Sequence, residues 1–330
     1  MKLPTKEDVS LQKWRIPQES GEAIVPYYKV DIPLSDKSQI VLLHKQDHLP
    51  PEAMAACQSF YSRSTLSVSK LMKRVLGEKG FDGFMDTYYI KYGDKSIGDC
   101  GSIYLFIENV SMLAAKAIQD WWAYNGQESS TRYIDFSKQV FFDPLGTEKS
   151  AQMLKELRDL HMTTFKLVQD HVLQQRPQQE DESDSEYKKA VRARSFDIAR
   201  STIPAGALTN LSWHVNLRQL ADKLDYLRHH PLEEIRAIAA GIESLALVAH
   251  PHAFKAKRYT DTEQYRSRWM RNGYLQSDGP EFHFESLINL KTLGNYREVL
   301  WNRPEKTELP RIVGEAGIFN VECKIDYGSY

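Results

Sequence analysis

The segment Gln127–Tyr133, written QESSTRY, gathers hydrogen-bonding side chains around one arginine. Glu128, Ser130 and Arg132 occupy alternate positions, so an extended loop would turn all three side chains to the same side. Arginine binds phosphates and planar carbonyl edges through two parallel, charge-assisted hydrogen bonds. The spacing is therefore compatible with a site for an anion such as a nucleotide. On pattern alone the preferred interpretation is a polar turn in which Ser and Thr bond the local backbone and Arg132 pairs with Glu128.

A second group of polar residues lies further along the chain. Its members are Arg194, Arg200, Asn216, Arg218 and Arg228. Arginines repeated at helical offsets are typical of a solvated helix face, which is one interpretation of this group. Together with Arg132, the same side chains could instead close a pocket for an anion. The pattern alone leaves both interpretations open.

Regular elements must position these residues. The apolar run at residues 103–107 predicts a strand, and helical spacing from residue 112 predicts a helix that stops at Asn125-Gly126. The QESSTRY loop would then lie just past the end of that helix. Strand-like segments also occur at AIVPYYKV and QIVLLHK within the first 50 residues, and the alternation in GIFNVECKIDY predicts another near residue 319.

Helical spacing dominates the rest of the chain. It covers residues 53–75, residues 148–174, the segment AVRARSFDIARSTI before Pro204, the segment LTNLSWHVNLRQLADKLDYLR, a segment that opens at Pro231, and ESLINLKTLGNYREVLW. A few strands combined with many helices predict an α+β fold, with a mixed β-sheet and a helical bundle.

The composition excludes several classes of protein. The net charge of −1 over 330 residues gives no general electrostatic footprint for a polynucleotide. Cys57, Cys100 and Cys323 are too few and too scattered for a disulfide framework or a Cys-x-x-Cys zinc site, so we expect no metal. No apolar stretch approaches the roughly 18 residues of a membrane helix, and the first residues have no apolar signal segment. We expect a soluble, cytoplasmic protein without a membrane partner.

Four segments, in order, resemble the landmarks of the flavin-dependent thymidylate synthase family. That family's signature can be written R-H-R-x-x-S-x-N-E-x-S-x-R-Y, followed by A-R-x-x-L-P, N-x-R and an E-I-R helix. The matching residues are Glu128, Ser130, Arg132 and Tyr133; Ala199, Arg200 and Pro204; Asn216 and Arg218; and Glu234, Ile235 and Arg236. YGDKSIGDCG also looks like the family's G-H-x-S-P-F-E-H element and keeps Gly93 and Ser96. The resemblance covers roughly residues 55 to 250.

The resemblance implies an α+β enzyme that transfers a one-carbon unit from methylene-tetrahydrofolate to C5 of dUMP, with FAD reduced by NADPH as hydride source. It implies a homo-oligomer, a dimer or tetramer. It places Ser130, Arg132 and Arg200 around the uridylate, and Arg228 near the pyrimidine if one residue is inserted. We expect Glu128 in the same pocket, Ser130 as the catalytic hydroxyl, and Ser96, Asn216 and Arg218 toward the cofactor. The phosphate of a nucleotide suits arginines, and a hydroxyl can follow charge developing on the uracil ring.

This chain departs from the family where flavin is normally gripped. The R-H-R segment reads Asp120-Trp121-Trp122, which replaces cationic donors by one acid and two indoles. Trp121 and Trp122 could stack on a flat ring such as an isoalloxazine or pterin, or could close a core; core packing is the preferred interpretation. Cys100 replaces the imidazole of the upstream element and is interpreted as a small buried residue or as a redox partner.

The expected organisation is a lead-in with strands at residues 1–50, a thymidylate synthase-like domain at 51–250, and a helical and strand extension at 251–330. The last residues of the extension resemble the family's strand that precedes the R-H-R helix, so the extension could begin a second repeat. The leading hypothesis is C5 methylation of a uridylate. The alternatives are a nucleotide-binding homologue without catalysis or flavin, and a flavin-independent C5 modification of another pyrimidine.

Overall fold

The computed structural model describes residues 1–18, 21–43, 50–73, 85–87, 94–255, 258–274 and 281–325. The chain divides into two compact units, Met1–Tyr274 and Leu275–Tyr330. The sequence placed boundaries at residues 50 and 250, whereas the division falls after residue 274. The first 50 residues belong to the larger unit because three strands of its sheet come from them.

A six-stranded antiparallel sheet organises the first unit. In spatial order its strands are β1 (Ser10–Gln18), β2 (Gly21–Asp31), β3 (Gln39–Leu43), β4 (Ser102–Ser111), β6 (Leu208–Asn216) and β5 (Gly126–Glu128). The strands predicted at AIVPYYKV, QIVLLHK and residues 103–107 are confirmed as β2, β3 and β4. With the helices described below, the sheet confirms the predicted α+β class.

Strand β6 corrects one sequence prediction. Helical spacing was predicted for the whole of LTNLSWHVNLRQLADKLDYLR, but Leu208–Asn216 is a strand, and helix α7 (Leu217–Leu227) begins only after it. Leu211, Trp213 and Val215 are buried at alternate positions, which is the period of a strand. Pairing with β4 on one side and β5 on the other satisfies the backbone of this segment, so the strand prevails over the helical pattern.

The helices of the first unit are α1 (Pro51–Ser62), α2 (Val68–Lys73), α4 (Met112–Gln119), α5 (Glu148–Gln175), α6 (Asp184–Ala199), α7, α8 (Glu233–Ala249), α9 (Pro251–Phe254) and α10 (Thr260–Tyr274). Short 3₁₀ turns add η1 (Lys6–Asp8), η4 (Lys95–Cys100), η5 (Thr131–Tyr133) and η6 (Arg200–Thr202). The predicted helix at 148–174 is confirmed as α5, and the helix predicted from residue 112 is confirmed as α4, although it ends at Gln119 and not at Asn125-Gly126. The helix predicted across residues 53–75 is instead broken between α1 and α2, and α8 starts two residues after Pro231.

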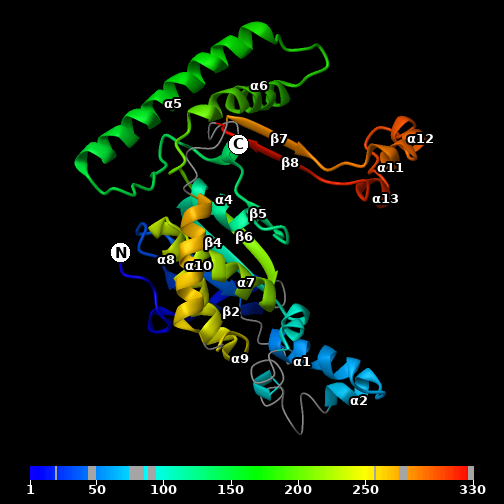
Figure 1. The fold of residues 1–330 in the computed structure, drawn as a ribbon. Helices are drawn as coiled ribbons and strands as arrows, with labels where there is room; N and C mark the ends of the chain where they lie inside the picture. The colour runs from blue at the N-terminus through cyan, green and yellow to red at the C-terminus, as the bar shows by residue number, and fades with distance from the viewer. Residues whose placement is uncertain are drawn as a thin grey trace. The chain divides into compact units, whose positions relative to one another are not determined.

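One main core lies between the sheet and helices α4, α7 and α8 (Figure 1). The strands contribute Val30, Ile40, Leu42, Ile103, Leu105, Ile107, Leu211, Trp213 and Val215, and the helices contribute Ala114, Ile118, Leu217, Leu220, Leu224, Ile238, Ile242 and Leu245. Gly241 allows α8 to approach β3 closely, because a Cβ atom there would lie 2.9 Å from Ile40 Cδ1. Burial of these apolar side chains is the main force that fixes the sheet and its helices together.

Helices α5 and α6 run side by side and have a small core of their own (Figure 1). It contains Phe136, Phe196, Ile203 and Ala207, so it joins the segment after η5 to the segment that leads from α6 into β6. His161 of α5 is buried there, and its Nδ1 lies 2.9 Å from Thr202 Oγ1. This cluster brings the QESSTRY and ARSTIP segments into one neighbourhood.

The second unit contains the strand pair β7 (Phe282–Ser286) and β8 (Phe319–Cys323) and the short helices α11 (Leu290–Gly294), α12 (Arg297–Trp301) and α13 (Arg311–Gly314). The strand predicted near residue 319 is confirmed as β8, and the helix predicted over ESLINLKTLGNYREVLW is two short helices. The idea that this segment begins a second repeat stays a prediction. Within the described ranges, no helix is both long and apolar enough to cross a membrane.

Trp213 should report on the packing of β6 without a hydrogen-bond contribution. Its side chain is fully buried and stacks on Tyr124, and its Nε1 has no hydrogen-bond partner among the described residues. We expect Trp213→Ala to lower the free energy of unfolding by about 3–5 kcal/mol. Trp213→Phe should cost less than half as much, because it keeps an aromatic ring and removes an unsatisfied donor. Urea denaturation followed by circular dichroism measures both; equal losses would contradict the packing described here.

Candidate functional site

The QESSTRY loop is held against the edge of the sheet by strand β5. Gly126 starts this strand, and a side chain there would collide with the Ser212 carbonyl of β6. The backbone continues the contact beyond the strand, since Ser129 N donates to Asn210 O at 2.8 Å. Glycine is therefore required for the close pairing that fixes where the loop begins.

The guanidinium of Arg132 is joined to helix α6. Its Nε donates to Asp197 Oδ1 at 3.0 Å, and its Nη2 donates to Asp197 Oδ2 at 2.6 Å. The guanidinium remains half exposed, with 50% of the side chain accessible. Arg132 thus pairs with Asp197 of another element, while Ser130 bonds the local backbone as the alternative of a polar turn predicts.

Arg200 follows Asp197 by three residues and forms the start of η6. It is exposed, and within the described part of the chain no hydrogen bond or ion pair of its side chain is seen. Ser130 is also exposed, and its Oγ accepts a long hydrogen bond of 3.4 Å from Arg132 N. Ser130, Arg132 and Arg200 therefore come from two distant segments whose contact is set by the Arg132–Asp197 pair.

Glu128 forms its hydrogen bonds with helix α4 and not with these arginines. Its Oε2 accepts from Gln119 Nε2 at 2.7 Å and lies 3.3 Å from Lys116 Nζ, both on helix α4. The side chain is mostly buried. These contacts tie the loop to the end of α4, and a role for Glu128 in substrate binding stays a prediction.

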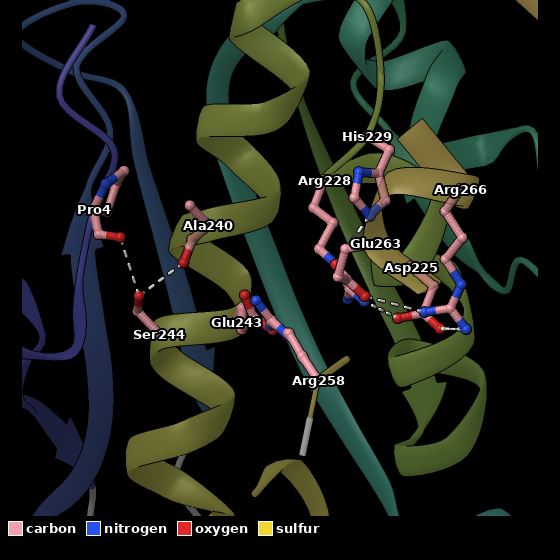
Figure 2. A network of polar contacts seen from close by, with 10 residues as sticks. All are labelled: Pro4, Asp225, Arg228, His229, Ala240, Glu243, Ser244, Arg258, Glu263 and Arg266. Atoms are coloured by element: carbon pink, nitrogen blue, oxygen red, sulfur yellow. Dashed lines mark hydrogen bonds and ion pairs between the residues drawn. The ribbon is translucent and has the colours of Figure 1, made fainter. Parts of the chain in front are cut away.

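Arg228 lies in a different cluster, at the end of α7. Its Nε donates to Glu263 Oε2 at 2.8 Å, and its Nη2 lies 2.5 Å from Asp225 Oδ1. Arg266 of α10 pairs with the same Asp225 at 2.7 Å, and His229 Nε2 lies 3.0 Å from Glu263 (Figure 2). Only 14% of the Arg228 side chain is accessible. Arg228 thus links the end of α7 to α10 through its ion pair with Glu263. A contact of Arg228 with a pyrimidine stays a prediction.

This cluster shifts the titration of its members. Hydrogen bonding from Arg228 lowers the pKa of Glu263 to about 2, against an ordinary value of 4.5. Burial lowers the pKa of His229, although Glu263 acts in the opposite direction. The carboxylate is therefore charged at neutral pH, where it bonds to Arg228 and also contacts His229 and Arg266.

A cavity of about 910 Å³ lies beside the cluster, between the turn after α4 and helices α7 and α10. It is lined by Asp99, Trp121, Trp122, Arg218, Gln219, Asp222, Asp225, Tyr226, Tyr265, Arg266, Trp269 and Met270. Three of the residues predicted to face a cofactor, Trp121, Trp122 and Arg218, are thus found together. Five aromatic rings share the walls with three carboxylates and two guanidinium groups.

The preferred interpretation of the tryptophan pair as core is wrong for Trp122. Its side chain is 84% exposed, because it lies in a turn beyond the last residue of α4 and points away from the main core. Trp121 is half-buried, and its Nε1 donates to Gln219 Oε1 at 2.9 Å. Lys223 Nζ lies 5.3 Å from the Trp121 ring centroid and donates to the Asp120 carbonyl at 2.6 Å. Burial lowers the pKa of Lys223 to about 8.

The flavin implied by the resemblance does not fit these residues. A dinucleotide carries a diphosphate, which needs cationic donors. Arg218 is paired with Asp99 at 2.8 Å and with Asp222 at 3.7 Å, and Arg266 is paired with Asp225. The carboxylates of the cavity thus already engage its guanidinium groups. The diphosphate would meet more negative than positive charge.

The other predicted cofactor residues have local contacts. Asn216 Oδ1 accepts from Gln219 N at 2.7 Å and caps the start of α7. Ser96 Oγ donates to Asp94 Oδ1 at 2.8 Å, and Ser96 does not line the large cavity. Their assignment to a cofactor stays a prediction. Cys100 is half-buried against a small apolar cluster, and burial followed by the Asp99 charge raises its pKa, which favours the unreactive thiol.

The fold and site define an α+β protein in which a polar loop on an edge strand meets the arginine-bearing end of a helix. Residues 43–252 match the family model described as "Thymidylate synthase complementing protein". The chain belongs to this family, as its ordered landmarks indicate.

Several relatives are similar in sequence to part of this chain. A UPF0159 protein of Chlamydia muridarum (strain MoPn / Nigg) is 30% identical over 221 residues, 58% of this chain and 42% of that protein. A UPF0159 protein of Chlamydia pneumoniae is 29% identical over 228 residues, 60% of this chain and 43% of that protein. A UPF0159 protein of Thermoplasma acidophilum is 24% identical over 195 residues, which are 49% of this chain and 39% of that protein. The match thus spans about two fifths of the length of each relative.

The Arg228–Glu263 pair should make stability depend on acid pH. A carboxyl whose pKa is lowered by folding stabilises the folded state above its unfolded pKa and loses this effect as pH falls through the folded pKa. We expect Glu263→Gln to cost about 2 kcal/mol at neutral pH, typical of losing hydrogen bonds to a charged group. The difference from the unmodified protein should shrink as pH falls from 4.5 to about 2.

Chemical denaturation at a series of pH values measures this difference. Asp261→Asn provides the control, because Asp261 is an exposed acid on the same helix. Its effect should be smaller throughout. A Glu263→Gln difference that stays constant between pH 5 and pH 2 would contradict the role given to the pair.

Proposed function

We propose that this chain binds a pyrimidine nucleotide, a uridylate, at the surface formed by Ser130, Arg132 and Arg200. The observation that carries the proposal is the bidentate Arg132–Asp197 pair, which joins the QESSTRY loop to helix α6, and Arg200 follows the last residue of that helix. Two segments that match separate landmarks of the family are thereby neighbours. Membership of the family supports the choice of a uridylate as ligand.

The chemistry of the three side chains suits this ligand. Arg200 and Arg132 are both accessible, and guanidinium groups form strong, directional hydrogen bonds with a phosphate dianion. Asp197 holds Arg132 in one orientation, which lowers the entropy that the ligand must otherwise remove. Ser130 supplies a neutral hydroxyl that can bind the phosphate or a carbonyl of the base.

The reaction that we propose is C5 methylation of dUMP, with methylene-tetrahydrofolate as one-carbon donor and FAD reduced by NADPH as hydride source. In this reaction the chain's own residues bind and orient the uridylate, and the Ser130 hydroxyl stabilises charge that develops on the ring. Because the described cavity does not fit a flavin diphosphate, the proposal requires flavin-binding residues from elsewhere, such as a second copy in a homo-oligomer. We propose a cytoplasmic location, without a polynucleotide or membrane partner.

The charge of the cavity favours a second candidate function. Asp120 stands where the family has a cation, and the guanidinium groups of the cavity are paired with carboxylates. A member that binds nucleotide without flavin, and therefore without this methylation, accounts for that charge. The two candidates share the uridylate site and differ in the cofactor.

Arg200→Ala tests the shared site. We expect dUMP affinity, measured by isothermal titration calorimetry, to fall by at least about tenfold, because one charge-assisted contact is lost. Deoxyuridine lacks the phosphate, so the preference for dUMP over deoxyuridine should shrink in the same variant. The control is Arg192→Ala, because Arg192 is an exposed arginine of α6 that lies about 140° away from Asp197 around the helix. Unchanged dUMP binding by Arg200→Ala would overturn the site.

Absorption spectroscopy separates the two candidate functions. Purified protein incubated with FAD and passed through a desalting column should show a flavin band if the first candidate holds, and should then convert dUMP to dTMP with methylene-tetrahydrofolate and NADPH. Protein that binds dUMP but retains no FAD and forms no dTMP supports the second candidate. Protein that binds neither dUMP nor FAD contradicts both.

A further inference from the structure

The cavity between α7 and α10 carries an unbalanced negative charge. Asp99 and Asp222 both approach one guanidinium, that of Arg218, at 2.8 and 3.7 Å. Both carboxylates remain more than one third exposed. Two acids share one base here, so one negative charge is left without a partner among the described residues that line the cavity.

The ion-pair cluster beside the cavity is balanced, and of its four groups Asp225 and Arg266 line the cavity. Asp225 and Glu263 face Arg228 and Arg266, two acids against two bases, and these four groups are linked by ion pairs of 2.5 to 3.4 Å (Figure 2). Their charges are thus engaged with one another. The excess charge of the lining therefore lies beside Asp99 and Asp222.

Aromatic rings supply most of the remaining wall. Trp121 lies 5.6 Å from Tyr226 and 6.2 Å from Trp122, measured between ring centroids. Tyr265 and Trp269 form a second pair on α10, with centroids 6.2 Å apart. The exposed fractions of Trp122, Trp269 and Tyr265 are 84%, 62% and 64%. Ring faces are thus available to a ligand, and an indole face attracts cations more strongly than any other side-chain ring.

We propose that this cavity binds a flat organic cation that carries a single positive charge. The ring system of the ligand stacks on the tryptophans, and its charge offsets the unpaired negative charge at Asp99 and Asp222. The volume of about 910 Å³ is sufficient for a molecule of three fused rings. The site goes beyond the uridylate site and does not depend on it, since it shares none of the residues Ser130, Arg132 and Arg200. The same charge disfavours anionic dinucleotides.

A matched pair of probes isolates the effect of charge. N-methylacridinium is a flat cation, and acridine is nearly the same shape and neutral at pH 8. We expect N-methylacridinium to quench the tryptophan fluorescence of the full chain with an affinity at least about tenfold higher than that of acridine. A tenfold excess of FAD should not displace it. Raising the salt concentration should weaken the binding of the cation and leave that of acridine nearly unchanged.

Variants locate the site. Trp122→Ala should weaken N-methylacridinium binding by about tenfold. The control is Trp301→Ala, because Trp301 is equally exposed at 84% and lies in the second unit. Asp222→Asn should weaken binding of the cation and reduce its advantage over acridine, whereas Asp159→Asn on the exposed side of α5 should not. Dye fluorescence provides the readout where a tryptophan has been removed.

Three results would overturn the proposal. The first is equal affinity for acridine and N-methylacridinium, which would mean that the charge is not recognised. The second is displacement of the cation by FAD. The third is a loss of affinity in Trp301→Ala as large as that in Trp122→Ala. Circular dichroism spectra that match the unmodified protein exclude unfolding as the cause of a loss, and both tryptophans are exposed enough for this to be expected.

Discussion

The antiparallel pairing of β6 with β4 and β5 determines where each candidate site lies. At its start, β6 follows the η6 turn that carries Arg200, and along one edge it pairs with β5, from which the QESSTRY loop emerges. At its end, Asn216 caps α7, which forms one wall of the aromatic cavity. The buried side chains of this strand anchor it in the main core. A shift of β6 by one residue would turn its buried side chains to the other face and move both sites.

Ion pairs between helices then set the electrostatic character of each site. Asp197 and Glu263 each hold an arginine that the sequence indicated as a ligand contact, but the two pairs differ in exposure. Arg132 is half exposed, so its charge can still act on a ligand in water. Arg228 is mostly buried, and separating it from Glu263 would leave a charge without a partner in a region of low dielectric, which is costly. The same kind of bond therefore orients one arginine and removes the other from the accessible surface.

Much of the fold could be predicted from the sequence where an element has a single strong period. The strand at residues 103–107 and the long helix at 148–174 are of this kind, and the ordered landmarks sufficed to indicate the family. Strand β6 could not be predicted, because Leu208, Leu211 and Val215 also fit a helical spacing. Only the pairing with β4 and β5 decides between the two structures, and that pairing depends on residues far away in the chain.

The candidate site was predictable in its residue types and not in its partners. Arg132 and Asp197 are separated by 65 positions, and Arg228 and Glu263 by 35, and no local pattern indicates which acid will meet which arginine. The orientation of Trp122 was similarly hidden, since a tryptophan after a helix can face a core or solvent according to what packs beside it.

Replacement of a cationic segment by Asp120-Trp121-Trp122 has consequences beyond the three residues. Asp120, Trp121 and Trp122 add no cation beside a wall that contains Asp99, Asp222 and Asp225. Lys223 is not among the residues that line the cavity, and its ammonium group donates to the Asp120 carbonyl beside the Trp121 ring. The sheet and core that define the fold contribute none of the residues that line this cavity, so its charge can differ without a change of fold.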